Sequence, residues 1–204
     1  KDQKNDFCLG LKNFFDIADY ITVNISSPNT EGLRDFHDQE KLKDLLATLN
    51  KIKKDNKTNI PLLLKVSPDI KENDIPEITD VATKNNISAI VLTNTTNSNR
   101  DNLKSDAKKE VGGLSGEPLR QISTNMIKKF HTQLHGKIPI IGVGGVNSGK
   151  SAYEKIIAGA SLLQLYTGFV YRGPSVVKNI KKELIQILKA EGVKDIKEVV
   201  GKGV

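Results

Sequence analysis

Short apolar runs alternate with longer amphipathic stretches along the chain. The runs are rich in β-branched residues and almost uninterrupted, which is typical of strands buried on both faces of a parallel sheet. They predict strands at residues 20–25, 61–66, 89–93, 139–143 and 162–166. The stretches between and after them have helical periodicity and predict helices at residues 39–55, 75–85, 118–134, 151–158 and 174–191. Pro118 and Pro174 suit a first helical turn, and Gly192 suits a helix end.

The strand–helix order repeats five times, which requires a parallel sheet that is either doubly wound or closed into a barrel. A (β/α)8 TIM-type barrel takes about 250 residues and eight strands. Five βα units therefore indicate about the last five units of such a barrel, if the sheet is closed. No low-complexity tract or Pro/Ser linker divides residues 1–204, so we expect one domain without an internal boundary.

The chain carries a formal net charge of +7 over 204 residues. The excess is mostly lysine on predicted helices, without interleaved aromatic residues, which favours solvated helix faces over a nucleic-acid surface. A basic anion-binding or nucleic-acid-binding module stays open as an alternative. The longest apolar run, residues 139–146, is far shorter than the roughly 20 residues that span a bilayer.

The start of the chain indicates a piece of a longer protein, because it begins with Lys1 and residues 1–6 show no apolar core of a signal peptide. Cys8 is the single cysteine and cannot form an internal disulfide. A reducing compartment is consistent with that composition.

Polar residues and glycines follow each predicted strand. In barrels and open α/β sheets alike, ligands bind at the edge formed by the carboxyl ends of the strands. The residues at that edge are Asn24, Ser27, Lys65, Asn94, Thr95, Gly144, Gly145, Tyr166 and Thr167. The polar stretch 97–117, which ends in GGLSG, is long for a connection and indicates a binding loop.

Lys65 interrupts an apolar run and is predicted at the top of a buried strand. An unpaired charge there costs several kcal/mol, so its ammonium needs an anionic or strongly polar partner. That partner is either a ligand, such as a flavin or a phosphate, or an internal salt bridge. Thr93 and its neighbours Asn94 to Thr96 either hydrogen-bond a planar polar ligand or cap a turn.

The segment IPIIGVGGVNSG is a strand that leads into a glycine turn before a helix. Glycines let backbone N–H groups approach a phosphate, and a following helix N-terminus adds a favourable dipole. The same place also fits G-x-x-x-x-G-K-[ST] through Gly144, Gly149, Lys150 and Ser151, so a P-loop NTPase is an alternative. Against it, no predicted strand ends in the aspartate that such an enzyme uses for Mg²⁺.

His131 and His135 have the i, i+4 spacing of metal ligands, but no third ligand accompanies them. We therefore expect a surface pair and no metal.

Six segments occur in order along almost the whole chain: VNISSPNTEGLR (23–34), LLLKVSPD (62–69), IVLTNTT (90–96), GGLSGEPLR (112–120), IPIIGVGGVNSG (138–149) and AGASLLQLYT (158–167). Together they closely resemble the dihydroorotate dehydrogenase family. The serine of SSPNT resembles the class 2, quinone-linked group, because class 1 enzymes carry a cysteine base at that place.

The resemblance implies an FMN flavoprotein on a (β/α)8 barrel, an oxidoreductase that converts dihydroorotate to orotate in pyrimidine biosynthesis with a quinone as final acceptor. It assigns the catalytic base to Ser27, whereas strand alternation alone groups Ser26 with Asn24 and favours Ser26. A serine is a poor base unaided, so Thr30 or water is expected to take the proton onward. Substrate contacts are implied for Asn24, Asn29, Asn94 and Thr95, and FMN contacts for Asn24, Lys65, Thr93, Gly116, Gly144, Gly145, Tyr166 and Thr167.

The resemblance begins just before the fourth barrel strand. The first three strands, and the N-terminal helical segment that class 2 members use for quinone and membrane contact, are therefore expected outside this chain. Eukaryotic members generally sit on the mitochondrial inner membrane and bacterial ones on the cytoplasmic membrane, and no nucleic-acid partner is expected.

Overall fold

The computed structural model describes residues 2–98, 100–101 and 103–204 of the chain. Its five strands form one parallel sheet in the sequential order β1-β2-β3-β4-β5. A doubly wound sheet reverses direction along its strand order, whereas a barrel adds each strand beside the last. The strict sequence of strands therefore confirms a partial TIM-type barrel. The strands are β1 (Ile21–Asn24), β2 (Leu62–Val66), β3 (Ala89–Leu92), β4 (Ile140–Val143) and β5 (Ala160–Gln164).

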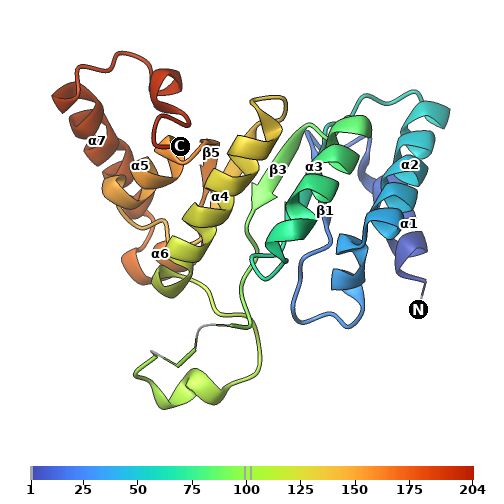
Figure 1. Ribbon diagram of the computed structural model, residues 1–204, viewed down its shortest axis with the longest axis horizontal. Helices are drawn as coiled ribbons and strands as arrows, with labels where there is room; N and C mark the ends of the chain where they lie inside the picture. The colour runs from blue at the N-terminus through green and yellow to red at the C-terminus, as the bar shows by residue number, and fades with distance from the viewer. Residues whose placement is uncertain (1, 99, 102) are drawn as a thin grey trace.

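The helices form a row against one face of this sheet, in which the first five pack in chain order and the last packs against the two before it (Figure 1). They are α1 (Gln3–Phe14), α2 (Gln39–Asp55), α3 (Ile75–Lys84), α4 (Arg120–Leu134), α5 (Gly149–Ile157), α6 (Thr167–Arg172) and α7 (Ser175–Ala190). Short 3-10 turns η1 (Leu33–His37), η2 (Glu72–Asp74), η3 (Asp106–Lys109), η4 (Glu117–Leu119) and η5 (Ile196–Val199) punctuate the connections. In the described ranges, no helix combines the length and the apolar character needed to cross a bilayer.

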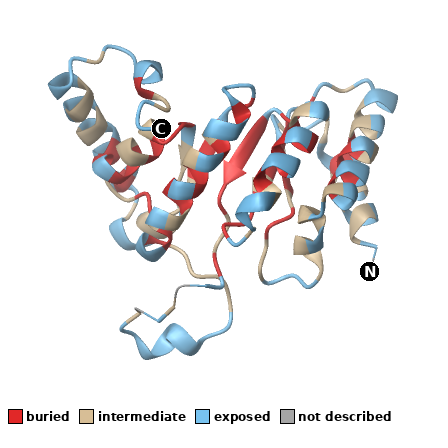
Figure 2. Cartoon of the chain, viewed as in Figure 1, coloured by how far each residue is buried: buried red, intermediate tan, exposed pale blue. Residues whose placement is uncertain are grey.

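The two faces of the sheet belong to different apolar clusters. Leu62 and Leu64 of β2 join the main core beneath the helices, together with the fully buried Phe130 of α4. Leu63, which points to the opposite face, joins a small cluster with Val91 and other residues of β3 and β4. Figure 2 shows β3, in the middle of the sheet, and the inward sides of the helices as buried. The parallel direction of all the strands places their carboxyl ends at one edge of the sheet.

Several element bounds differ from those expected. The last strand is Ala160–Gln164 rather than 162–166, because β5 pairs with β4 from Ile140↔Ala160 onward and a register irregularity follows. The α5 helix starts at Gly149 because Ser148 caps it. Helices α1 and α6 were not expected at all.

Candidate functional site

A cavity of about 510 Å³ lies at the carboxyl edge of the sheet. Its walls come from the ends of β2, β3, β4 and β5 and from the connection before α4, as the barrel pattern requires. The lining residues are Lys65, Thr93, Asn94, Thr95, Ser115, Gly116, Leu119, Val143, Gly144, Gly145, Val146, Gln164, Leu165, Tyr166, Thr167 and Gly168. A neighbouring hollow of about 500 Å³ shares Gly145 and Thr167 with it and extends towards Arg172.

Lys65 faces this cavity from β2 and is half-buried. Burial lowers the pKa of its ammonium. No salt bridge or hydrogen bond reaches the Lys65 side chain among the residues that the structure describes. Of the two readings from the sequence, a ligand-facing cation is therefore favoured over an internal ion pair. The site can offer a positive charge to an electron-rich or anionic ligand.

Three polar side chains from two strand ends form a compact network beside the cavity. The Ser26 hydroxyl donates to Asn24 Oδ1 at 2.7 Å, and Asn94 Nδ2 donates to Ser26 Oγ at 2.9 Å. Asn94 Oδ1 in turn accepts from the backbone N–H of Thr95 at 2.7 Å. Ser26 is fully buried, so its hydroxyl is committed to orienting the two amides. Strand alternation correctly grouped Ser26 with Asn24. In the structure, Ser26 holds the side chains of Asn24 and Asn94 by hydrogen bonds.

Ser27 lies one residue further, where β1 has ended, and its side chain is half-buried. Its Oγ accepts from the backbone N–H of Asn29 at 3.2 Å and from Thr30 Oγ1 at 3.5 Å. Ser27, Asn24 and Asn29 do not line the 510 Å³ cavity, although Asn24 contacts Asn94, which does. The Ser27 hydroxyl is thus free of a strong internal partner in the described part of the chain and available to a reactant.

An ion pair ties the loops after β1, β2 and β3 together behind these residues. Arg34 Nη2 lies 3.1 Å from Asp69 Oδ2, and both side chains are largely buried. The Asp69 carboxylate also accepts from Thr96 Oγ1, from Ser98 Oγ at 3.1 Å and from the backbone N–H of Asn97 at 3.0 Å. Every partner of this carboxylate is a donor, which makes it the anchor of the strand-end loops.

Replacing Asp69 with asparagine is expected to lower the free energy of unfolding by about 2 kcal/mol, the scale of hydrogen bonds to a charged group. The amide Nδ2 would face donors where the carboxylate oxygen accepted. Asp44→Asn is the matched control, because the Asp44 carboxylate pairs with Lys4 at the surface and is 64% exposed. Chemical denaturation measures both variants, and equal stability would contradict the anchoring role.

His37 also connects the loops after β1 and β2, through hydrogen bonds to Arg34 and Ser67. Ser67 N–H approaches His37 Nε2 at 3.4 Å, and His37 Nδ1 lies 2.9 Å from the carbonyl oxygen of Arg34. With Nε2 accepting, Nδ1 carries the proton and donates. Burial lowers the pKa of His37, which favours this neutral form.

The glycine turn after β4 rests directly on the start of α4. Gly145 has φ +70°, and a Cβ there would lie 2.4 Å from the Cβ of Arg120. Gly144, with φ +120°, is less crowded, and a Cβ there would lie 3.0 Å from the Cβ of Ser123. Only residues without a side chain allow this close approach, which turns the backbone towards the cavity.

The N-terminus of α5, expected to face a phosphate, already has its partners. Gly149 N–H donates to Glu183 Oε2 at 2.5 Å, and Ser151 N–H donates to the Ser148 side chain at 3.2 Å. Two of its first three N–H groups thus have partners, and one of these partners is the Glu183 carboxylate. A contribution of this helix N-terminus to phosphate binding therefore stays a prediction that these contacts disfavour, and Lys150 next to it is exposed and absent from the cavity lining.

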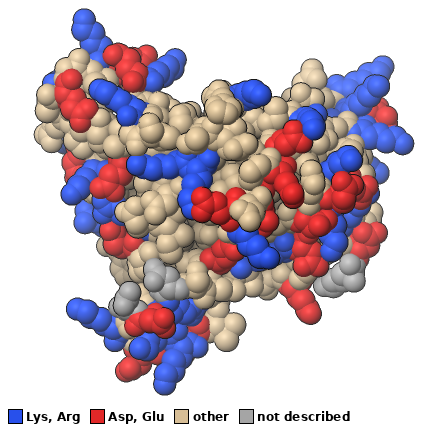
Figure 3. Space-filling model, in the orientation of Figure 1, with Lys and Arg blue, Asp and Glu red and all other residues tan. Residues whose placement is uncertain are grey.

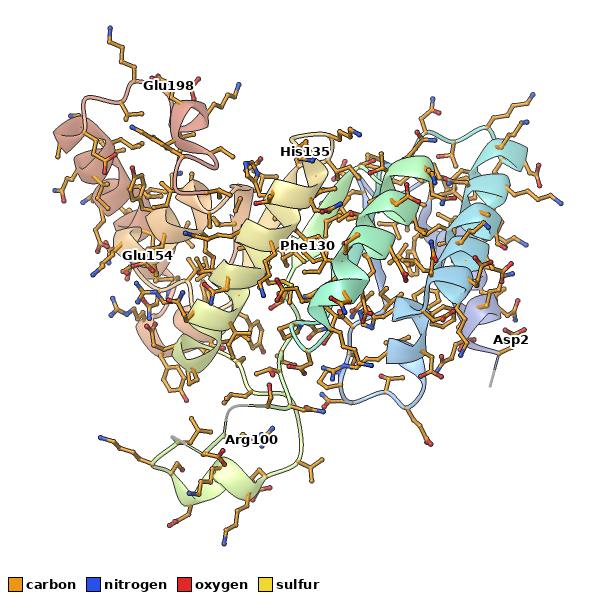
Figure 4. The ribbon with its side chains drawn as sticks, in the orientation of Figure 1. Asp2, Arg100, Phe130, His135, Glu154 and Glu198 are labelled. Carbon is orange, nitrogen blue, oxygen red and sulfur yellow. The ribbon has the colours of Figure 1, made fainter. Side chains whose placement is uncertain are left out.

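The connection from β3 to α4 projects from the body (Figure 1). Thr96 and Leu114 close its base as an isolated bridge, and Arg100 donates to the carbonyl oxygens of Lys108, Glu110 and Gly112 (Figure 4). Asn99 and Asn102 of the stretch 97–117 lie outside the described residues. Of the described residues in the stretch, Ser115 and Gly116 near its end line the cavity.

Sequence reasoning missed several wall residues. Ser115 was not singled out, although its hydroxyl lies 2.8 Å from Thr167 Oγ1 and joins two motifs. Leu119, Gln164 and Gly168 also line the cavity, and their place directly beside recognised motif residues was the available signal. His131 packs against Gly159 and Gly201, while His135 caps α4.

The comparisons with known proteins agree in one family. The family model described as dihydroorotate dehydrogenase matches residues 1–188. The chain is 42% identical over 206 residues to a mitochondrial dihydroorotate dehydrogenase (quinone) of Arabidopsis thaliana, covering 98% of this chain and 45% of the relative. It is 44% identical over 181 residues to the quinone enzyme of Christiangramia forsetii, covering 89% and 53%.

Solved structures show the same similarity in three dimensions. The ligand-free DHODH of Eimeria tenella superposes with a TM-score of 0.94 at 31% identity, covering 99% of this chain and 60% of the other. The ferulenol complex of that protein gives a TM-score of 0.93 at 32% identity and covers 98% and 57%. The chain spans about half the length of the curated relatives it matches.

Proposed function

The chain belongs to the dihydroorotate dehydrogenase family, and from this premise we propose that it is the C-terminal part of a quinone-linked dihydroorotate dehydrogenase. The whole protein would oxidise dihydroorotate to orotate on FMN, pass the electrons to a quinone and serve pyrimidine biosynthesis. One observation carries the proposal: a single cavity gathers Lys65, the Thr93–Thr95 segment, Gly116, the Gly144–Gly145 turn and the Tyr166–Thr167 pair, which come from separate family motifs.

The residues around the cavity fit FMN. Lys65 supplies an ammonium that lacks a partner in the described part of the chain, suited to the electron-rich pyrimidine end of a flavin. The Gly144–Gly145 turn lines the cavity and carries no side chain of its own, which suits a phosphate. Tyr166 and Thr167 stand beside that turn, and Thr93 and Gly116 complete the wall.

Bound FMN would supply the acceptor for the hydride that leaves C6 of dihydroorotate. Ser27 Oγ would take the proton from C5 of the substrate, and Thr30 Oγ1 at 3.5 Å is the neighbouring hydroxyl that can pass a proton onward. Asn24 and Asn94 would orient the substrate, with Asn29 and Thr95 as further polar contacts. The side-chain amides of Asn24 and Asn94 are preorganised through Ser26, so little ordering of these two remains when substrate binds.

The rest of the barrel is proposed to come from the part of the protein that lies outside these residues. Strands β1 and β5 are the free edges of the described sheet, and Leu162 of β5 is 62% exposed. We propose that three further strands close the sheet between them. Quinone and peripheral membrane contact would belong to a segment outside this chain, at the mitochondrial inner membrane in a eukaryote or the cytoplasmic membrane in a bacterium.

The test is purification of the full-length protein. We expect a yellow protein that contains FMN and reduces a quinone analogue when dihydroorotate is added. A colourless product that cannot be reconstituted with FMN, or a flavoprotein inert towards dihydroorotate, would overturn the proposed function.

In Figure 3, acidic and basic side chains intermingle over much of the visible face, so no broad basic surface favours nucleic acid there.

Replacing Lys150 with alanine is expected to leave FMN content and turnover within about twofold of the wild type, as for surface changes in general. Its side chain is exposed and does not line the cavity. Lys181→Ala on α7, another exposed lysine, is the matched control. Mg²⁺-ATP binding by the wild type that disappears in Lys150→Ala would instead revive the P-loop NTPase alternative.

A further inference from the structure

We propose that Lys155 is a positioning residue for the phosphate-binding turn Gly144–Gly145, acting through the first turn of α4. This inference rests on the proposed binding of FMN. Lys155 does not line the cavity and belongs to none of the six family segments, so neither motif nor pocket points to it.

Lys155 is a fully buried lysine, with 0% of its surface exposed. Its Nζ donates to Ser123 Oγ at 3.0 Å, to Thr124 Oγ1 at 3.1 Å and to the carbonyl oxygen of Arg120 at 3.4 Å. All three acceptors belong to the first turns of α4, whereas Lys155 comes from α5. The ammonium therefore joins two helices at the end of α4 nearest the cavity. Three oxygens around one ammonium use its full donor capacity.

The turn rests on the same residues that Lys155 holds. The Ser123 hydroxyl donates to the carbonyl oxygen of Val143, the last residue of β4 before the turn. Gly144 packs on Ser123, and Gly145 packs on the backbone and Cβ of Arg120. A shift of the first turn of α4 would thus move both glycines and the direction of their N–H groups.

A second set of charges fixes the same platform from outside. Arg120 forms ion pairs with Glu154 and with Glu117, and Glu117 also accepts from Asn147 beyond the turn. Figure 4 places Glu154 between α4 and α5. Burial, and next the Arg120 guanidinium, lower the pKa of Lys155 to about 7, while Glu154 and Glu117 oppose the shift. Burying an amine costs free energy, so a lysine at this position indicates a role that an apolar residue would not fill.

The experiment compares two flavins that differ only in the phosphate. Full-length protein is stripped of flavin, and the dissociation constants of FMN and riboflavin are measured by fluorescence quenching. Supporting residues behind metal ligands contribute about 10- to 100-fold to affinity, so for Lys155→Met we expect FMN binding to weaken about tenfold or more. Riboflavin binding should stay near the wild-type value. A general packing defect would instead weaken both flavins equally.

Two further variants keep the inference falsifiable. Ser123→Ala retains the Cβ under Gly144 but removes the hydroxyl between Lys155 and Val143, and it should weaken FMN selectively if Lys155→Met fails to fold. Lys150→Met, an exposed lysine on the same helix, should change neither constant. Wild-type protein that does not bind FMN would overturn the proposed function and this inference with it. A wild type that prefers FMN, with the same preference kept in Lys155→Met or Ser123→Ala, would overturn the inference alone.

Discussion

Replacing Ser27 with alanine is expected to slow the reduction of bound FMN by dihydroorotate by about 10²- to 10⁴-fold, the usual contribution of a general base, while FMN stays bound. The Ser27 side chain lies outside the cavity lining, and among the described residues its Oγ has only the Asn29 N–H and the Thr30 hydroxyl at 3.5 Å as partners. Its loss therefore removes a proton acceptor without disturbing the flavin wall. Anaerobic stopped-flow absorbance of the flavin measures the rate.

Ser26→Ala is the comparison that decides between the two serines. Ser26 is fully buried and holds Asn24 and Asn94 through bonds of 2.7 and 2.9 Å. Its loss should raise KM for dihydroorotate and slow the reduction at saturation far less than Ser27→Ala does. A larger loss of rate in Ser26→Ala would move the base role to Ser26, the residue that strand alternation favours.

The helices and strands were predictable where burial makes apolar residues recur regularly along the sequence. Strands β2, β3 and β4 appear as apolar runs because most of their residues are buried on both faces. Helix α2 has the expected bounds 39–55 because Leu42, Leu45, Leu46 and Leu49 repeat along one face. By contrast, α1 buries only Leu11, and α6 spans six residues with a glycine inside, so neither offers a helical period. The β5 strand starts at Ala160 and Ser161, small residues without a strand signal.

The candidate site was predictable where chemistry sits at a strand end. Lys65 and Asn94 are polar residues that follow apolar runs, and this contrast can be recognised in the amino-acid sequence. The burial of Lys155 could not be predicted from the sequence, because a lysine on an amphipathic helix is normally solvated. Its burial arises when α4 and α5 pack together, which no local pattern encodes. The partners of the α5 N-terminus likewise depend on Glu183, which lies 34 residues further along the chain.

Replacing Gly145 with alanine is expected to weaken FMN binding about 100-fold, the scale of effect that a displacement of about 1 Å can produce at a binding site. The added Cβ would lie 2.4 Å from the Cβ and 2.8 Å from the Cα of Arg120, so the glycine turn or the first turn of α4 has to move. Either movement redirects the N–H groups proposed to hold the phosphate. Titration of flavin-free full-length protein with FMN gives the dissociation constant.

Gly136→Ala separates this steric effect from backbone strain. Gly136 has φ +75°, close to the +70° of Gly145, but a Cβ there meets nothing within 4 Å. Both alanines have the same left-handed strain of about 1–2 kcal/mol, so both variants should lose thermal stability. Only Gly145→Ala should lose FMN, because only there does the side chain strike the support of the turn. Equal FMN affinity in the two variants would show that the turn tolerates displacement and that the phosphate is held elsewhere.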